Sequence, residues 1–270
     1  MREKELFACS FLCYNIGISK PEGVTMSAVQ DYFVNLSALL ARTLDAQAQS
    51  MERAAQAIAA CLKSGHMVYT LGTGHGHLLA LEVFYRAGGM ARVCPVLDER
   101  LMLHISASES TQWERREEIV SELLEKYPIG SGDVLIAASN SGRNAAAVLY
   151  PLEAGRRGAT VIALTSMQHS RSVTPRNSAG LRLFETADIV LDNGGVPGDA
   201  ALVMADGMAV GPTSTAVGAA MLQAIACRVK EIAVQEGWEA EFFKSSNIDG
   251  GDEYNAALLE KYGGRIPRLV

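Results

Sequence analysis

The segment LGTGHGHLLALE at residues 71–82 places glycines, histidines and a glutamate close together in the chain. A dinucleotide-binding loop needs G-x-G-x-x-G followed by an acidic residue about 20 positions later. Gly72 and Gly74 fit this pattern and Asp98 is suitably placed, but His77 stands where the third glycine belongs. The match is therefore partial, and the sequence has no G-x-x-x-x-G-K-[ST] nucleotide loop.

The same segment offers an H-x-H pair that could chelate a metal ion. His75 and His77 would need further ligands such as His104 or His169, and no acidic residue lies at ligand spacing from the pair. We therefore expect neither a metal nor a cofactor. His75 is expected to line a pocket, while His77 begins a helix.

A second polar segment, SNSGRN at residues 139–144, lies between a buried apolar strand and a helix. Hydroxyls and backbone N–H groups at the positive end of a helix dipole suit a phosphate monoester. Simple N-capping would need one such residue rather than several in a row. Arg143 either pairs with the anion or faces solvent. The candidate phosphate-binding residues are Ser139, Asn140, Ser141, Gly142, Arg143 and Asn144.

A third segment, GPTST at residues 211–215, stands at the start of another predicted helix. Thr213, Ser214 and Thr215 offer hydroxyls there, and capping alone explains them equally well. Asp192 and Asp199 precede this segment and could bind hydroxyl groups of a ligand or form turns.

The elements that must position these segments follow from the apolar pattern. Near-continuous apolar runs separated by helical patterns are typical of parallel strands covered on both faces. The sequence thus predicts a doubly wound α/β fold with a five-stranded parallel sheet, in which ligands bind beyond the carboxyl ends of the strands. The predicted strands are 67–71, 91–97, 133–139, 159–166 and 187–193, and the main helices are 27–63 (one helix or two stacked), 77–89, 111–127, 144–158, 212–237 and 253–261.

Composition excludes several classes of protein. The chain has 270 residues, a net charge of −6 and a pI of about 5.5, which argues against a nucleic-acid-binding surface. No run approaches the ~20 apolar residues of a membrane span. Five cysteines without a C-x-x-C pair fit a reducing cytoplasm. We expect residues 1–25 to be a poorly ordered extension, with Met26 as a candidate start, and residues 26–270 to form one domain.

These motifs together resemble the SIS (sugar isomerase) domain family from Met26 to the C-terminus. The resemblance is carried by the glycine-rich turn, SNSGRN, ALTS at 163–166 and GPTST. FYRAGG, HSR and NIDGGDEYN further resemble a bacterial branch described as phosphosugar or phosphoheptose isomerases. The resemblance implies a phosphosugar site on the carboxyl edge of the sheet, within homodimers or homotetramers whose sites lie near subunit interfaces.

Carried over by position, the resemblance assigns Ser139, Ser141, Gly142 and Asn144 to a phosphate cradle flanked by Thr165 and Ser166. In the first loop the corresponding ligand contacts would come from Gly72, Thr73 and Gly74. One position departs from the family, because Gly76 stands where SIS proteins commonly have a serine.

The activity implied is aldose–ketose isomerisation of a phosphorylated sugar, which needs a base to move a proton between C2 and C1. Glu82 is the predicted base, and its alternative role is an i,i+4 ion pair with Arg86. His75 and His169 are candidate acid or ring-opening groups. A lyase acting by β-elimination and a non-catalytic phosphosugar sensor are the alternatives. SIS sensors are commonly fused to a DNA-binding domain, and no such basic domain is expected here.

Overall fold

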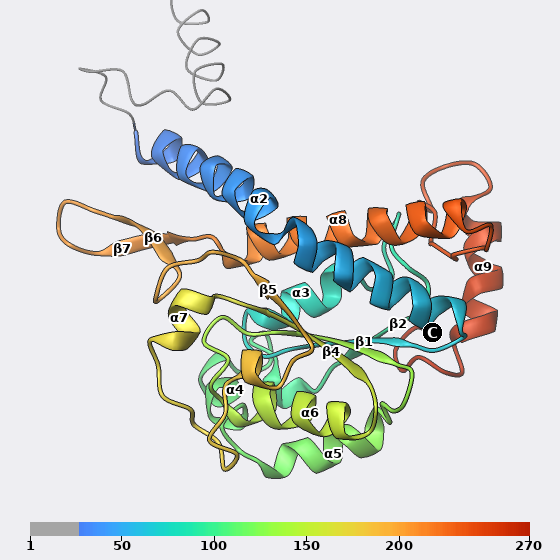
Figure 1. Ribbon diagram of the computed structural model, residues 1–270, viewed down its shortest axis with the longest axis horizontal. Helices are drawn as coiled ribbons and strands as arrows, with labels where there is room; N and C mark the ends of the chain where they lie inside the picture. Colours follow the sequence, from blue (N-terminus) through green and yellow to red (C-terminus); the bar gives the residue numbers. More distant parts are fainter. Residues whose placement is uncertain (1–26) are drawn as a thin grey trace, which may run out of the picture.

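Five parallel strands form the centre of the computed structural model, which describes residues 27–270 (Figure 1). The predicted extension at residues 1–25 lies outside the described residues. The strand order is β2-β1-β3-β4-β5, as expected for a doubly wound sheet. The strands are β1 (Val68–Gly72), β2 (Val93–Val96), β3 (Val134–Ala138), β4 (Thr160–Thr165) and β5 (Ile189–Asp192). All five predicted strands are confirmed.

Alternate residues of each strand face two separate hydrophobic cores. Along β3, Leu135 and Ala137 pack against the helices of one face, whereas Val134, Ile136 and Ala138 pack against those of the other. Because both faces are covered, every residue of β1 and β3 is buried, and β3 is apolar throughout.

Figure 1 shows the helices as two layers around the sheet. Helices α2 (Ala28–Lys63), α3 (Gly76–Glu82) and α8 (Ser214–Gln235) supply one core. Helices α5 (Glu118–Lys126), α6 (Ala145–Arg156) and α9 (Gly251–Tyr262) supply the other. Shorter elements are α4 (Ala107–Trp113), α7 (Met167–Arg171) and the 3-10 turns η1 (Glu99–Leu101) and η2 (Leu183–Glu185). Residues 28–63 form a single helix, capped by Ser27 and Gln30 in a capping box.

Three helix predictions were wrong in their bounds. The predicted helix 111–127 is divided between α4 and α5 by a turn between Trp113 and Glu118, in which the Glu114 carbonyl oxygen accepts the Ala146 N–H at 3.1 Å. Helix α3 ends at Glu82 rather than continuing to residue 89. Pro212 is the last residue of a strand and not the first turn of a helix.

That strand belongs to an unpredicted antiparallel hairpin, β6 (Ala200–Val203) and β7 (Ala209–Pro212). Its turn contains Asp206 and Gly207, and the Asp206 carboxylate accepts the Met208 N–H at 3.0 Å. The hairpin projects from the sheet beside the first turns of α2 (Figure 1), where the Tyr32 hydroxyl donates to the Pro212 carbonyl oxygen at 2.8 Å.

The parallel register brings the loops together at one edge. Gly72 of β1 pairs with Ala138 of β3, and Thr165 of β4 pairs with Asp192 of β5. The loops that follow these strands therefore begin at the same edge of the sheet, which is where a doubly wound fold binds its ligands.

Candidate active site

Residues 139–144, here called the cradle loop, connect β3 to α6 and are held by a dense set of hydrogen bonds. The Ser139 N–H donates to the Leu164 carbonyl oxygen at 3.0 Å, and its hydroxyl accepts the Gly142 N–H at 3.1 Å. The Asn140 amide oxygen accepts from the Asn193 amide at 2.7 Å. Gly142 has φ +53°, a conformation that glycine adopts without strain. The loop is thereby fixed before any ligand binds.

Thr165 and Ser166, at the carboxyl end of β4, lie against the cradle loop. Both side chains are fully buried. The Thr165 hydroxyl donates to the Asn140 carbonyl oxygen at 3.0 Å, and the Ser166 hydroxyl donates to the Gly195 carbonyl oxygen at 2.5 Å. Both hydroxyls are thus engaged inside the protein: Thr165 holds the cradle loop, and Ser166 holds the loop that follows β5.

The start of α6 is left without a side-chain cap. Within residues 27–270, no side chain accepts a hydrogen bond from its first N–H groups, although Asn144 occupies the N-cap position. The Ala146 N–H is satisfied by the Glu114 carbonyl oxygen. Among residues 27–270, no carboxylate therefore accepts a hydrogen bond from the first backbone N–H groups of this twelve-residue helix, whose positive end faces the cradle loop.

Glu114 is a functional candidate that the sequence analysis missed. Its carboxylate accepts the Thr73 hydroxyl at 2.8 Å and the Asn144 amide at 2.7 Å, so it joins the loop after β1 to the start of α6. Burial raises the pKa of Glu114, against the opposing effects of the Thr73 hydrogen bond and of Arg115. No local pattern announces this residue, since it lies in a charged run that is typical of a solvated helix face.

A covering segment, residues 172–182, lies against the cradle loop. The Arg176 N–H and the Asn177 amide both donate to the Arg143 carbonyl oxygen, at 2.8 and 3.0 Å. The Ser178 hydroxyl donates to the Glu117 carboxylate at 2.7 Å, which ties the segment to the turn before α5. The loop and its cover are therefore one connected unit.

Buried polar atoms without a partner collect at this place. Native proteins contain few such atoms, and each calls for an explanation such as a ligand or an ion. Among residues 27–270, the buried side-chain atoms that lack a hydrogen-bond partner are Arg143 Nε, Asn144 Oδ1, His169 Nδ1 and Asn177 Oδ1. All four belong to the cradle loop, to the covering segment or to α7 beside them.

His169 lies on α7, next to the cradle loop. Its backbone N–H donates to the Ser166 hydroxyl at 3.1 Å. Burial lowers the pKa of the imidazole; the Asp199 carboxylate opposes this shift and the Arg143 guanidinium reinforces it. A neutral imidazole next to the loop could accept or relay a proton. His75 lies in the N-cap position of α3, where its exposed side chain makes no capping hydrogen bond.

Glu82, the predicted base, lies at the far end of α3 from the loop after β1. Seven helical residues separate the two ends by roughly 10 Å. The Glu82 carboxylate accepts from the Arg86 guanidinium and, at 3.0 Å, from the Gln223 amide of α8. The structure thus shows the ion pair that the i,i+4 spacing offered as the alternative.

The glycines of the first loop allow close packing of backbone against backbone. A β-carbon at Gly72 would lie 2.1 Å from the Gly76 carbonyl oxygen, and one at Gly76 would lie 2.6 Å from the Ala138 carbonyl oxygen. Gly76 therefore has a packing reason to differ from the serine that the family commonly has. Gly74, with φ +55°, has open space around it.

The start of α8 is occupied by an internal carboxylate. Asp199 accepts the Thr213 N–H at 3.2 Å, the Ser214 N–H at 3.0 Å and the Ser214 hydroxyl. Thr213 is buried, and Thr215 is half-buried in the first turn of the helix. The hydroxyl-rich sequence here caps a helix with the protein's own anion.

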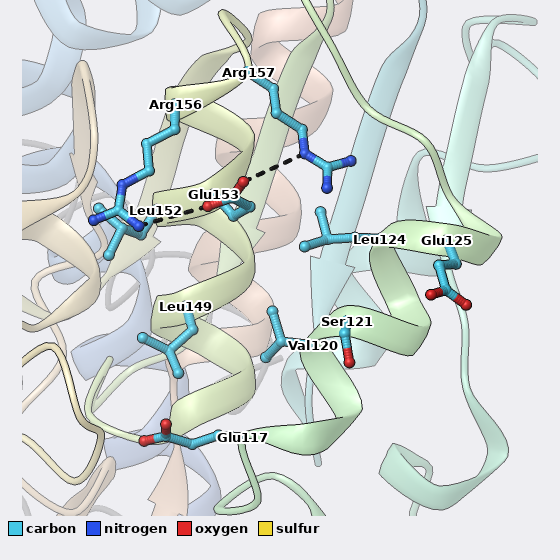
Figure 2. Close-up of a pocket in the computed structure, with 10 residues that line it drawn as sticks. All are labelled: Glu117, Val120, Ser121, Leu124, Glu125, Leu149, Leu152, Glu153, Arg156 and Arg157. Carbon is cyan, nitrogen blue, oxygen red and sulfur yellow. Dashed lines mark ion pairs between the residues drawn. The ribbon is translucent and has the colours of Figure 1, made fainter.

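A groove lined by both apolar and charged side chains lies between α5 and α6, away from the cradle loop. Figure 2 shows Val120 and Leu149 facing across it. Glu153 of α6 accepts ion pairs from Arg156 and Arg157, both at 3.6 Å. Both arginines that line this groove are therefore already paired with a carboxylate of the protein.

Two further observations apply to residues 27–270. No group of three or more histidine, cysteine, aspartate or glutamate side chains is arranged to hold a metal ion. No helix in this part of the chain has the length and apolar character needed to cross a membrane.

Comparison with known proteins agrees with this fold. The family model described as "SIS domain" matches residues 31–166, half of the chain. A UPF0309 protein of Shouchella clausii is 40% identical over 89% of this chain and 99% of its own length. A UPF0309 protein of Listeria innocua is 41% identical over 86% of this chain and 94% of its own. The chain therefore belongs to the SIS domain family.

Solved structures share the fold at low sequence identity. A phosphoheptose isomerase from Francisella tularensis aligns with a TM-score of 0.51 and 17% identity, over 76% of this chain and 100% of that one. The Vibrio vulnificus NanR protein complexed with ManNAc-6P aligns with a TM-score of 0.50 and 15% identity, over 90% of this chain and 70% of that one.

Proposed function

We propose that this protein binds a phosphorylated sugar with its phosphate at the cradle loop and the start of α6. The carrying observation is the uncapped helix start beside a group of buried, unpartnered polar atoms. The binding residues we propose are Gly72, Thr73, Gly74, Ser139, Asn140, Ser141, Gly142, Arg143, Asn144, Thr165, Ser166, Thr213, Ser214 and Thr215, of which Thr165, Ser166 and Thr213 act through the loops they hold. The ManNAc-6P bound to the NanR neighbour supports this class of ligand.

We further propose aldose–ketose isomerisation by proton transfer, with Glu114 as the base. A carboxyl group whose pKa is raised by burial is better matched to proton abstraction near neutral pH than an exposed one. Thr73 and Asn144 hold both of its oxygens, so its position relative to the phosphate is fixed. His169, buried beside the same loop, is the proposed acid or ring-opening group.

Glu82 and His75 remain predictions for the same roles. Glu82 would have to exchange its ion pair with Arg86 for a substrate contact. A direct comparison of Glu114→Gln with Glu82→Gln separates the two glutamates, because each variant keeps the shape of the side chain and removes its charge.

The test uses loss of the substrate C2 proton into D2O, followed by NMR, with ligand binding measured by thermal shift. Glu114→Gln is expected to keep binding and to lower exchange about 10²–10⁴-fold, while Glu82→Gln exchanges within a few-fold of wild type. The reverse ranking would assign the base to Glu82. Binding without exchange in the wild-type protein would favour the non-catalytic sensor.

We also propose a homo-oligomer that buries the first half of α2 and the β6–β7 hairpin. Phe33 is 65% exposed and Val203 75% exposed, and Met208 is 63% exposed on the same hairpin. Large exposed apolar side chains gathered on neighbouring elements mark interaction surfaces. Light scattering should give a dimer or tetramer that Phe33→Glu dissociates; a monomeric wild-type protein would contradict this. The free buried thiols of Cys61 and Cys94 support a cytoplasmic location.

A further inference from the structure

Three arginines from three different segments lie near Glu114 and the start of α6, a region here called the mouth of the candidate site. Arg115 follows Glu114 in the turn between α4 and α5. Arg143 belongs to the cradle loop, and Arg176 belongs to the covering segment, where its N–H group donates to the Arg143 carbonyl oxygen. Arg176 also forms a parallel bridge with Asn144, the residue that binds Glu114.

None of these three guanidinium groups forms an ion pair within residues 27–270. Several arginines outside this group are paired, among them Arg100 with Asp98 and Glu122, Arg182 with Glu185, and Arg228 with Glu52 and Glu231. Arg143 donates only to the Thr174 hydroxyl, at 3.2 Å, and its Nε is buried without a partner.

The three positive charges act on one another. Arg143 and Arg115 lower the pKa of the Arg176 guanidinium, and Glu114 is the acidic group that opposes this shift. Gathering like charges costs free energy in the unliganded protein, and a bound anion reverses that cost. Arg115 and Arg176 are exposed, so they can reach a group on the open side of Glu114.

We infer that the substrate carries a second anionic group, a carboxylate, bound by Arg115 and Arg176 while the cradle loop holds the phosphate. The two donor sets differ in kind: the α6 start offers backbone N–H and hydroxyl groups, whereas the mouth offers guanidinium forks, which match planar carboxylates. The ligand class is then a phosphorylated sugar acid. This inference rests on the proposed function.

The test compares two open-chain probes, 6-phosphogluconate and glucitol 6-phosphate, which differ by a carboxylate against a hydroxymethyl group. Affinities are measured by calorimetry on the full chain. We expect the wild-type protein to prefer 6-phosphogluconate by about tenfold or more, the size of one charge-assisted contact. Arg115→Gln and Arg176→Gln should each reduce that preference by most of this factor, with glucitol 6-phosphate affinity changed less than about twofold.

Arg156→Gln is the matched control, because it removes the same charge from an exposed position in the last turn of α6, at the opposite end of that helix from the cradle loop. It should leave the preference intact. Equal wild-type affinity for the two probes, or equal weakening of both by the arginine variants, would overturn the inference and assign the guanidinium groups to the phosphate. Failure of both probes to bind the wild-type protein would instead contradict the proposed function, on which this inference depends.

Discussion

The starts of α6 and α8 have similar hydroxyl-rich sequences, but only the start of α8 is capped by a carboxylate of the protein. SNSGRN precedes α6 and GPTST precedes α8, and each offers several hydroxyl groups at the positive end of a helix. At α8 the Asp199 carboxylate already accepts two backbone N–H groups and a hydroxyl. At α6 no side chain of the described residues does so. Hydroxyl content alone therefore does not identify a ligand site; the absence of a side-chain acceptor for the helix's first N–H groups is the more informative feature.

The largest expected effect comes from giving α6 the internal anion that α8 has. Ser141→Asp places a carboxylate in the cradle loop, where like-charge contact with a phosphate costs several kcal/mol. Sugar phosphate affinity should fall by about 100-fold or more, as measured by calorimetry. The neutral control Ser141→Asn should stay within a few-fold of wild type. An unchanged affinity in the aspartate variant would place the phosphate elsewhere.

A third helix start, that of α3, tests whether an added hydroxyl can be accommodated. Gly76→Ser restores the residue that SIS proteins commonly have, but its β-carbon would meet the Ala138 carbonyl oxygen at 2.6 Å. We expect the free energy of unfolding to fall by about 1–3 kcal/mol, measured by urea denaturation. Gly74→Ser, whose β-carbon meets nothing within 4 Å, controls for the hydroxyl, although its positive φ adds some strain. A fully stable Gly76→Ser protein would refute the packing explanation.

Removing the internal anion of α8 has a smaller expected effect. Asp199→Asn keeps the shape and tolerates the observed φ of +67°, since asparagine enters the left-handed region readily. The loss of a charged cap should lower stability by about 1 kcal/mol, measured by thermal or urea unfolding. Sugar phosphate binding at the cradle loop should persist. Loss of that binding with unchanged stability would instead make the Asp199 carboxylate part of the ligand site.

The smallest expected effect is on the pH dependence of stability, to which Glu114 at the start of α6 contributes. Because burial raises the folded-state pKa of Glu114 above 4.5, the folded protein binds this proton more tightly than the unfolded chain does. Its contribution to stability is present below pH 4.5 and is lost as the pH rises through the raised pKa. Glu114→Gln should remove this part of the slope of stability against pH. Identical slopes in the two proteins would contradict a raised pKa.

The five strands of the parallel sheet were predictable because strands that are covered on both faces leave near-continuous apolar runs. The hairpin β6–β7 carried a signal that was overlooked: Asp206-Gly207 between apolar residues is a common hairpin turn. Glu114 could not have been found in this way. The break before α5 contains neither proline nor glycine, and in it the Glu114 carbonyl oxygen contacts Ala146, which is distant in sequence.

The candidate site was predictable only where its residues follow one another in the sequence. SNSGRN was recognisable because hydroxyls and a glycine follow a buried strand directly. Whether an anion from elsewhere in the chain already occupies a helix start depends on tertiary structure. Asp199 reaches α8 across an intervening hairpin, and Glu82 reaches Gln223 of another helix. Neither contact leaves a local trace in the sequence.

The central claim is that the start of α6 is a phosphate site. The most direct measurement is a thermal-shift panel of hexose, heptose and amino-sugar phosphates beside their unphosphorylated parents. At 100 times its dissociation constant a ligand stabilises the native state by about 2.7 kcal/mol. The account predicts stabilisation by at least one phosphate, lost in Ser141→Asp, and none by its parent sugar. Equal shifts with a sugar and its phosphate, or no shift with any of them, would contradict it.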